Sequence, residues 1–221
     1  MLLTDLPEHI ICNKIYNVTK KNINYNYIFT NSRSVKKFSI FAVNNNKKFK
    51  KKFINEAIKK GSVALLTQKY FKNYKIPQYI VNDVNLSISR LLYKLLPYQP
   101  INSVAITGTN GKTSVVWFIS QICLHNDFPV KTYGTLGYYI NGKKKDDSKL
   151  TTPEYELLHQ NSFLKRKNLF NFVFEVSSHA LDQNRLKDFP VNIAALTNIS
   201  HDHLDYHKNF KNYKETKLKL F

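Results

Sequence analysis

The stretch Thr107–Ser114, TGTNGKTS, decides how this chain folds. It continues the strand-like run VAIT, residues 104–107. Apolar residues then recur at helical spacing: Val115, Val116, Phe118, Ile119, Ile122 and Cys123. A strand, a Gly-rich turn and a helix bring backbone N–H groups and a helix N-terminus to one point, which suits phosphate oxygens. The stretch therefore predicts a P-loop-type nucleotide-binding domain.

Within this stretch each residue type has a chemical reason. Gly108 and Gly111 let the backbone approach a ligand closely, because they carry no side chain. Lys112 is placed to neutralise β- and γ-phosphates, and the Thr113 hydroxyl to reach Mg²⁺. The nucleotide-binding set is predicted to be Gly108, Thr109, Asn110, Gly111, Lys112, Thr113 and Ser114. The strict pattern G-x-x-x-x-G-K-[ST] has Gly where this chain has Ile106, so an ordinary strand-to-helix turn is the alternative.

Strand-like and helical segments alternate along the whole chain. After residue 100, apolar runs at 102–107, 128–136, 169–176 and 191–198 are typical of a parallel sheet covered on both faces. Before it, strand-like runs at 27–32, 38–43, 62–67 and 78–82 flank a helical segment at 51–61. Pro97 and Pro100 end a helical pattern. We predict a small N-terminal α/β domain, residues 1–98, and a P-loop-type central ATPase domain with a mostly parallel sheet, residues 99–221.

The composition is that of a globular protein with a net charge of +19. Such a charge favours an anionic partner, but the excess is mostly Lys and accompanies abundant Asn, Ile, Tyr and Phe, as in AT-rich coding sequences. Nucleic-acid binding, which also needs a shaped groove, is kept as an alternative. The runs Lys47–Lys52 and Lys143–Lys145 are interpreted as surface loops. Two isolated cysteines and the lack of a long apolar stretch predict a cytoplasmic protein without a membrane partner.

A carboxylate ends the apolar run Leu169–Phe174, and polar residues follow it. In open parallel sheets ligands bind beyond the carboxyl ends of the strands, which places Glu175 near a nucleotide-bound metal. A solvated side chain is the alternative. Ser177, Gln183 and Arg185 are either ligand contacts or helix caps and surface groups. The guanidinium of Arg185 suits a carboxylate or phosphate because it can bind two oxygens at once.

The segment Ser200–His207, SHDHLDYH, holds three histidines and two aspartates. It nearly matches the His-x-His-x-Asp-His metal motif of metallo-β-lactamase-like hydrolases, but Tyr206 separates Asp205 from His207, so the last ligand points elsewhere. The segment follows the strand-like run 191–198 and so reaches the same sheet edge as the phosphate loop. A zinc hydrolase with nitrogen-rich ligation remains an alternative.

A helical stripe near the end of the sequence contains a lysine. Phe210, Tyr213, Lys217 and Phe221 recur at spacings of three and four. Burial lowers the pKa of a lysine, and the neutral amine can form a carbamate with CO₂. The alternative is that the stem of Lys217 packs while its ammonium reaches solvent.

Six motifs together resemble the Mur ligase family, the ATP-dependent amide-forming enzymes of peptidoglycan synthesis. In family order they are TGTNGKTS, YGTLG (133–137), LTTPE (150–154), EVSSHALDQNRL (175–186), LTNISHDHLDYH (196–207) and NYKETKLKLF (212–221). The stretch 175–186 is most similar to that of the E members, which add the third residue of the stem peptide. Other Mur ligases and folylpolyglutamate synthetases share the phosphate loop but differ in this stretch, and they are the alternatives among related enzymes.

The resemblance implies a role for each matching position. Lys112, His203 and Lys217 are the implied catalytic residues. The implied ligands of two Mg²⁺ ions are Thr113, Glu175, His203 and a carbamylated Lys217. The implied substrate contacts are Ser32, Thr151, Thr152, Ser177, Gln183 and Arg185. Ser32 lies in TNSRSV, residues 30–35, where the family usually has Asp-Ser-Arg and this chain has Asn31-Ser32-Arg33.

The resemblance also implies a reaction. ATP phosphorylates the D-glutamyl carboxylate of UDP-N-acetylmuramoyl-L-alanyl-D-glutamate, and the amino group of a diamino acid, such as meso-diaminopimelate or L-lysine, attacks the acyl phosphate. Two Mg²⁺ ions and Lys112 stabilise the anionic oxygens. The partners are this UDP-linked dipeptide and the amino acid, and the protein is expected to be a monomer.

The family has a third, C-terminal domain, which receives the amino acid. The 221 residues end four positions after Lys217. We therefore expect a truncated, N-terminal fragment without that domain and without ligase activity of its own. Amino-acid-dependent ADP release by the purified chain would contradict this expectation.

Overall fold

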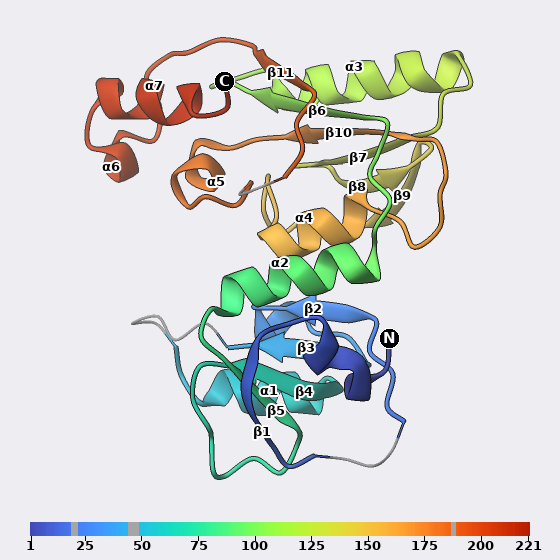
Figure 1. The fold of residues 1–221 in the computed structure, drawn as a ribbon. Helices are drawn as coiled ribbons and strands as arrows, with labels where there is room; N and C mark the ends of the chain where they lie inside the picture. The colour runs from blue at the N-terminus through green and yellow to red at the C-terminus, as the bar shows by residue number, and fades with distance from the viewer. Residues whose placement is uncertain (19–21, 44–48, 187–188) are drawn as a thin grey trace. The chain divides into compact units, whose positions relative to one another are not determined.

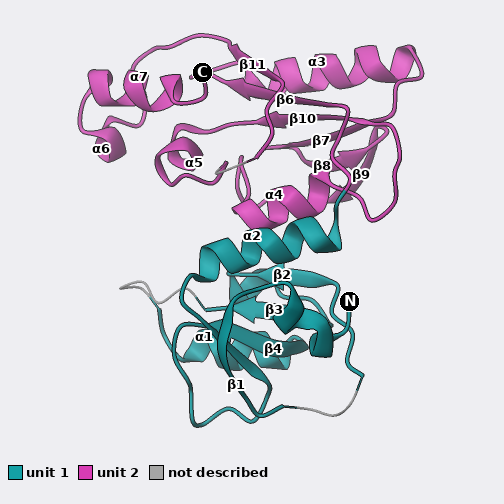
Figure 2. Ribbon diagram, in the orientation of Figure 1, with its two compact units in different colours: residues 1–97 teal, residues 98–221 magenta. Residues whose placement is uncertain are grey.

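The computed structural model describes residues 1–18, 22–43, 49–186 and 189–221. They form two compact units, Met1–Pro97 and Tyr98–Phe221 (Figures 1 and 2). The division falls at the prolines that follow the helix α2 (Val84–Leu95). Each unit contains its own sheet and its own buried residues.

Unit 1 is built on a five-stranded sheet in the order β1-β5-β4-β3-β2. Its elements are η1 (Leu3–Glu8), β1 (Cys12–Tyr16), β2 (Tyr27–Phe29), η2 (Ser32–Ser34), β3 (Ser39–Ala42), α1 (Lys52–Lys59), β4 (Ser62–Thr67), β5 (Gln78–Val81) and α2. All neighbouring strands are parallel except β1 and β5. The Asp83 side chain caps α2 by accepting a hydrogen bond from the Leu86 N–H, 2.9 Å away.

Unit 2 is built on a six-stranded sheet in the order β11-β6-β10-β7-β8-β9. Its elements are β6 (Asn102–Thr107), α3 (Lys112–His125), β7 (Val130–Gly134), β8 (Gly137–Ile140), β9 (Lys143–Asp146), α4 (Tyr155–Ser162), β10 (Asn171–Glu175), α5 (Ser178–Asp182), β11 (Ile193–Leu196), α6 (Leu204–His207) and α7 (Phe210–Leu218). Strands β11, β6, β10 and β7 are parallel, and β8 and β9 extend the sheet as an antiparallel hairpin. The predicted α/β class with mostly parallel sheets is confirmed.

The central strand β10 is buried on both faces. On the face covered by α3, Val173 joins a core with Ile106, Val116 and Val130. On the opposite face, the Phe172 ring stacks on that of Phe174 with centroids 5.0 Å apart, and Phe189 packs against both. Two covered faces explain why the whole run is apolar rather than alternating, and they fix the direction in which β10 delivers Glu175.

Two expectations from the sequence are wrong in detail. Lys143–Lys145 is not a loop but most of the edge strand β9, whose residues are all exposed. Charged side chains on an edge strand oppose pairing with other chains, so the run suits that position. In the other run, Lys47 and Lys48 lie outside the described residues, and Lys52 begins α1.

The helical stripes are narrower than the spacing predicts. On α3, Phe118 and Ile122 are 63% and 62% exposed, because this helix buries only the side that faces β6, β7 and β10. Phe221 lies beyond the last residue of α7 and is 65% exposed. Among the residues that the structure describes, no helix combines the length and the apolar character needed to cross a bilayer.

Candidate active site

The phosphate loop predicted at 107–114 connects β6 to α3. Gly108 and Gly111 both have positive φ, +148° and +82°. A Cβ at Gly108 would lie 1.9 Å from the Thr197 Oγ1 atom, at the end of the neighbouring strand β11. The Thr197 side chain in turn donates a hydrogen bond to the Asn110 carbonyl, 2.6 Å away. The loop is therefore pressed against β11, and glycine at 108 is needed for that close approach.

We expect Gly108→Ala to destabilise the chain more than Gly111→Ala. Both positions carry the strain of positive φ, about 1 kcal/mol or more for alanine. At Gly111 the nearest atom to an added Cβ is 3.8 Å away, an ordinary contact, whereas Gly108 also meets Thr197. Urea denaturation should show an additional loss of about 1–3 kcal/mol for Gly108→Ala. Equal losses for the two variants would contradict the close packing on β11.

Residues after β11 hold the loop through hydrogen bonds. Asn110 N–H donates to Asn198 Oδ1 (3.1 Å), and Asn198 Nδ2 donates to the Asn110 carbonyl (3.0 Å). The Thr109 hydroxyl is buried and lies 3.0 Å from the Tyr213 hydroxyl of α7. It also accepts a hydrogen bond from the Ser200 N–H, 3.0 Å away. The segment after β11 and helix α7 thus fix the shape of the loop.

Two lysine side chains meet at the Gly108 carbonyl. Lys112 Nζ donates to the carbonyls of Gly108 and Thr109, both at 2.8 Å, and Lys217 Nζ donates to the Gly108 carbonyl, also at 2.8 Å. Lys217 is 2% exposed, which excludes the alternative in which its ammonium reaches solvent. Burial, and then the positive charge of Lys112, lower the pKa of Lys217 to about 8. Burial also lowers the pKa of Lys112, against the opposing charges of Glu175 and Asp202.

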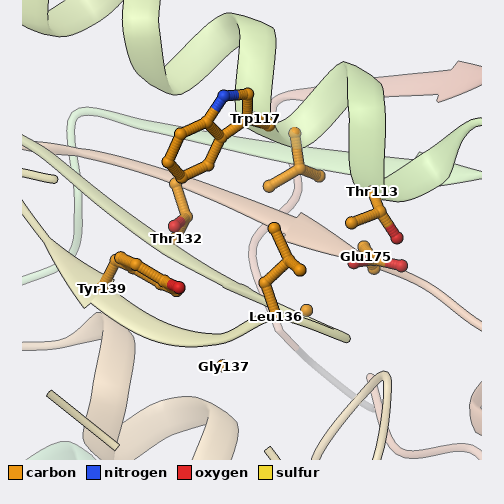
Figure 3. A pocket seen from close by; sticks show the side chains of 9 residues that line it. Thr113, Trp117, Thr132, Leu136, Gly137, Tyr139 and Glu175 are labelled. Carbon is orange, nitrogen blue, oxygen red and sulfur yellow. The ribbon is translucent and has the colours of Figure 1, made fainter. Parts of the chain in front are cut away.

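Glu175 ends β10 beside the start of α3. Its carboxylate is 1% exposed and accepts hydrogen bonds from the Thr135 N–H (2.8 Å) and the Thr135 hydroxyl (3.2 Å). Figure 3 shows the Thr113 hydroxyl on the same side of the cavity as this carboxylate. The cavity has a volume of about 10 Å³, close to the room needed by one water-sized species. The structure therefore brings two of the predicted metal ligands, Thr113 and Glu175, to one small cavity.

The His203 ring lies near the Tyr213 ring, with centroids 6.5 Å apart. The Lys217 Nζ lies 4.7 Å from the centroid of the same Tyr213 ring. His203 has a left-handed backbone, φ +50°, and its Nε2 is 3.5 Å from Asp202 Oδ2. In the described parts of the chain, no group of three or more His, Cys, Asp or Glu side chains is arranged to hold a metal ion.

The other histidines have structural partners. His207 is buried, and its Nε2 lies 3.0 Å from the Ser178 hydroxyl. His201 stacks on Phe210 with ring centroids 4.6 Å apart. Burial lowers the pKa of His207 and of His179. That His203 is the one direct metal ligand in this segment stays a prediction.

The predicted substrate residues of unit 2 converge around the loop that precedes α4. The Thr152 hydroxyl donates to the Glu175 carbonyl (2.9 Å) and accepts from the Ser177 N–H (2.9 Å). Arg185 donates to the Thr152 carbonyl (2.7 Å) and, through Nε and a terminal nitrogen, to Gln183 Oε1 (3.0 and 2.6 Å). This cluster is tied directly to the strand end that carries Glu175.

A model of the Mur ligase middle domain matches residues 106–221 of this chain, a range that contains the phosphate loop, Glu175, His203 and Lys217. The chain belongs to the Mur ligase family. Its relatives include a ligase from Rickettsia montanensis, 39% identical over 200 residues, which cover 86% of this chain and 41% of the relative. A ligase from Wigglesworthia glossinidia brevipalpis is 37% identical over 210 residues, covering 90% and 42%. Both are named UDP-N-acetylmuramoyl-L-alanyl-D-glutamate–2,6-diaminopimelate ligase.

Solved structures of Mur ligases share the fold. One with the same ligase name is 26% identical, with a TM-score of 0.64, and the match covers 89% of this chain and 40% of that chain. A MurF structure from Acinetobacter baumannii is 16% identical and has a TM-score of 0.63, and the match covers 99% of this chain and 45% of the MurF chain. This Mur ligase chain therefore spans about two fifths of the length of the curated relatives that it matches.

Ser32, the remaining predicted substrate residue of this Mur ligase chain, lies in unit 1. Its side chain is buried, and its hydroxyl donates to Glu56 Oε2, 2.8 Å away. This hydrogen bond lowers the pKa of Glu56. Asn31, which replaces the aspartate usual in Mur ligases, accepts from the Arg33 N–H (3.0 Å) and so caps η2. The side-chain oxygen at position 31 therefore still serves as a cap.

Sequence reasoning missed three contributors to this Mur ligase site: Thr135, Thr197 and Asn198. Thr135 binds the Glu175 carboxylate, while Thr197 and Asn198 hold the phosphate loop. All three lie inside motifs that the family resemblance already included, YGTLG and LTNISHDHLDYH. The available signal was that each follows a strand ending at the carboxyl edge of the sheet.

Proposed function

We propose that this chain carries the nucleotide site and the UDP-dipeptide site of a ligase that adds 2,6-diaminopimelate to UDP-N-acetylmuramoyl-L-alanyl-D-glutamate. The observation that carries this proposal is that the buried Lys217 and the partly buried Lys112 both donate hydrogen bonds to the Gly108 carbonyl, while the Glu175 carboxylate is buried and close enough to influence the charge of Lys112. Phosphate oxygens would find cationic and N–H donors on one side and a metal ligand on the other. The choice of dipeptide and diamino acid rests on the printed names of the relatives.

For the nucleotide, Lys112 and the N–H groups of the loop would bind the phosphates of ATP. Thr113 and Glu175 offer a hydroxyl and a carboxylate at a cavity of about 10 Å³, and oxygen ligands at a small site suit Mg²⁺. When bound, Mg²⁺ would neutralise charge that develops on the phosphate oxygens. A carbamate on Lys217 and the imidazole of His203, both of which lie near the Tyr213 ring, would hold a second Mg²⁺.

For the dipeptide, Arg185 and its neighbours Thr151, Thr152, Ser177 and Gln183 would bind the substrate. A D-glutamyl carboxylate oxygen attacks the γ-phosphorus, and ADP leaves. The amino group of diaminopimelate then attacks the acyl carbon, phosphate leaves, and the nitrogen loses a proton. Lys112 stabilises negative charge in both steps, because its ammonium is already partly desolvated before the substrates bind.

We also propose that the protein acts in the cytoplasm as a monomer, without nucleic acid or membrane partners. The UDP-linked substrate in the names of the relatives is a water-soluble nucleotide, which suits an enzyme that works in aqueous solution. The net charge of +19 is ascribed to the lysine-rich composition and not to a nucleic-acid partner.

Binding of the UDP-dipeptide tests the substrate assignment. We expect the chain to bind UDP-N-acetylmuramoyl-L-alanyl-D-glutamate in isothermal titration calorimetry, and Arg185→Met to weaken this binding about 10- to 100-fold, since a hydrogen-bonded charge contributes about 1.5–3 kcal/mol. Arg185→Lys should also lose affinity, because an ammonium cannot bind two oxygens in one plane. Arg166→Met, at an exposed arginine, is the matched control. Unchanged binding by folded Arg185→Met would refute the assigned role.

A further inference from the structure

We infer that Thr135 is a positioning residue: its hydroxyl orients the Glu175 carboxylate toward the metal that Thr113 and Glu175 would share. This inference rests on the proposed function, because it concerns that ion. Thr135 occupies both carboxylate oxygens, with its N–H 2.8 Å from Oε1 and its hydroxyl 3.2 Å from Oε2. A carboxylate held at both oxygens by one residue cannot rotate without breaking both hydrogen bonds.

The backbone around Thr135 leaves the carboxylate little freedom. Thr135 and Leu136 form the turn between β7 and β8, where Gly134 pairs with Gly137. A Cβ at Gly134 would lie 2.1 Å from Glu175 Oε1, so the backbone at Gly134 packs directly against the carboxylate. Gly137 has a φ of +123°, which an L side chain rarely adopts. The hairpin therefore fixes where the Thr135 hydroxyl and N–H point.

Thr135 also connects the metal side of the site with the substrate side. Its hydroxyl oxygen lies 3.4 Å from that of Thr151, in the loop predicted to bind the dipeptide. A carboxylate oxygen can only accept, so the single hydroxyl hydrogen of Thr135 goes to Glu175. The Thr151 hydroxyl can then supply the hydrogen of the second contact. A change at Thr135 should thus affect the orientation of Glu175 more strongly than the position of Thr151.

Metal dependence of ADP binding separates this role from a structural one. Thr135→Val removes the hydroxyl but keeps the side-chain shape and the N–H, and Thr135→Ser restores the hydroxyl. We measure ADP affinity by calorimetry in EDTA and across a Mg²⁺ series. Thr135→Val should raise the Mg²⁺ concentration at half-effect about 10-fold or more, as expected when a group that orients a metal ligand is lost. Its affinity for ADP in EDTA should equal that of the wild type, and Thr135→Ser should recover the wild-type Mg²⁺ midpoint.

Thr132→Val is the matched control. Thr132 lies in β7, just before the turn that contains Thr135, and it lines the Trp117 end of the cavity, away from Thr113 and Glu175 (Figure 3). This variant should leave the Mg²⁺ midpoint unchanged. If circular dichroism shows that Thr135→Val is unfolded, Thr135→Ala, which also lacks the hydroxyl, is tested in its place.

The outcomes distinguish the inference from the proposed function. Wild-type ADP binding that is indifferent to Mg²⁺ would refute the proposed metal site. Wild-type binding that depends on Mg²⁺, together with an unchanged midpoint in folded Thr135→Val, would overturn the positioning role alone. Failure of Thr135→Ser to recover the midpoint would overturn it too.

Discussion

Replacing Lys112 with methionine is expected to weaken ADP binding about 100-fold in the presence of Mg²⁺. The ammonium of Lys112 is partly desolvated and lies within the phosphate loop, 2.8 Å from two of its carbonyls. Hydrogen bonds that involve a charged group contribute about 1.5–3 kcal/mol, and about 2.7 kcal/mol corresponds to a factor of 100. Isothermal titration calorimetry measures the loss directly.

The control for Lys112→Met is Lys211→Met. The Lys211 side chain is 84% exposed, and its ion pair with Glu215, at 4.0 Å, contributes little. Urea denaturation of both variants shows whether the loop remains folded, because Lys112 also holds the carbonyls of Gly108 and Thr109. ADP affinity within threefold of the wild type in folded Lys112→Met would contradict the assignment of the phosphate loop.

Lys217 is expected to form a carbamate that ¹³C NMR detects when the chain is equilibrated with ¹³CO₂. Only the neutral amine reacts with CO₂, and the Lys217 pKa of about 8 makes that form available near neutral pH. At constant dissolved CO₂ the carbamate signal should rise as the pH increases from 6 toward 8, because deprotonation supplies the reactive amine. The anionic product would also replace repulsion between Lys217 and Lys112 by attraction.

A second buried lysine provides the control for the carbamate. Burial lowers the pKa of Lys131 to about 8 as well, but its Nζ lies under the Phe170 ring, 4.3 Å from the centroid. The carbamate signal should disappear in Lys217→Met and persist in Lys131→Met. A signal that survives Lys217→Met, or that falls as the pH rises, would contradict the carbamate role.

Much of this site follows from local sequence patterns. The phosphate loop was predictable because Gly-Lys-Thr at the start of a helix is rare outside phosphate sites, and Glu175 because an apolar run ended in a carboxylate. The helical stripe placed the stem of Lys217 against the protein but left open whether its ammonium reaches solvent, and Phe221 on the same stripe lies beyond the helix. These features depend on residues that are close together in the sequence.

The remaining features depend on contacts across the sheet. Thr197 approaches Gly108 because β11 pairs with β6, and Thr135 reaches Glu175 because β7 pairs with β10. The order of the strands in the sheet cannot be predicted from the positions of these residues in the sequence. The edge strand β9 escaped prediction because its exposed lysines lack the alternation that marks a half-buried strand.

The proposed ligase joins diaminopimelate to the UDP-dipeptide. The direct measurement uses the complete product of the gene with ATP, Mg²⁺, UDP-N-acetylmuramoyl-L-alanyl-D-glutamate and 2,6-diaminopimelate, and follows both ADP and the mass of the nucleotide product. We expect ADP release only when both acceptor and amino acid are present, with a product heavier by one diaminopimelate minus water. ADP release without the dipeptide, or without a mass change in it, would contradict the account.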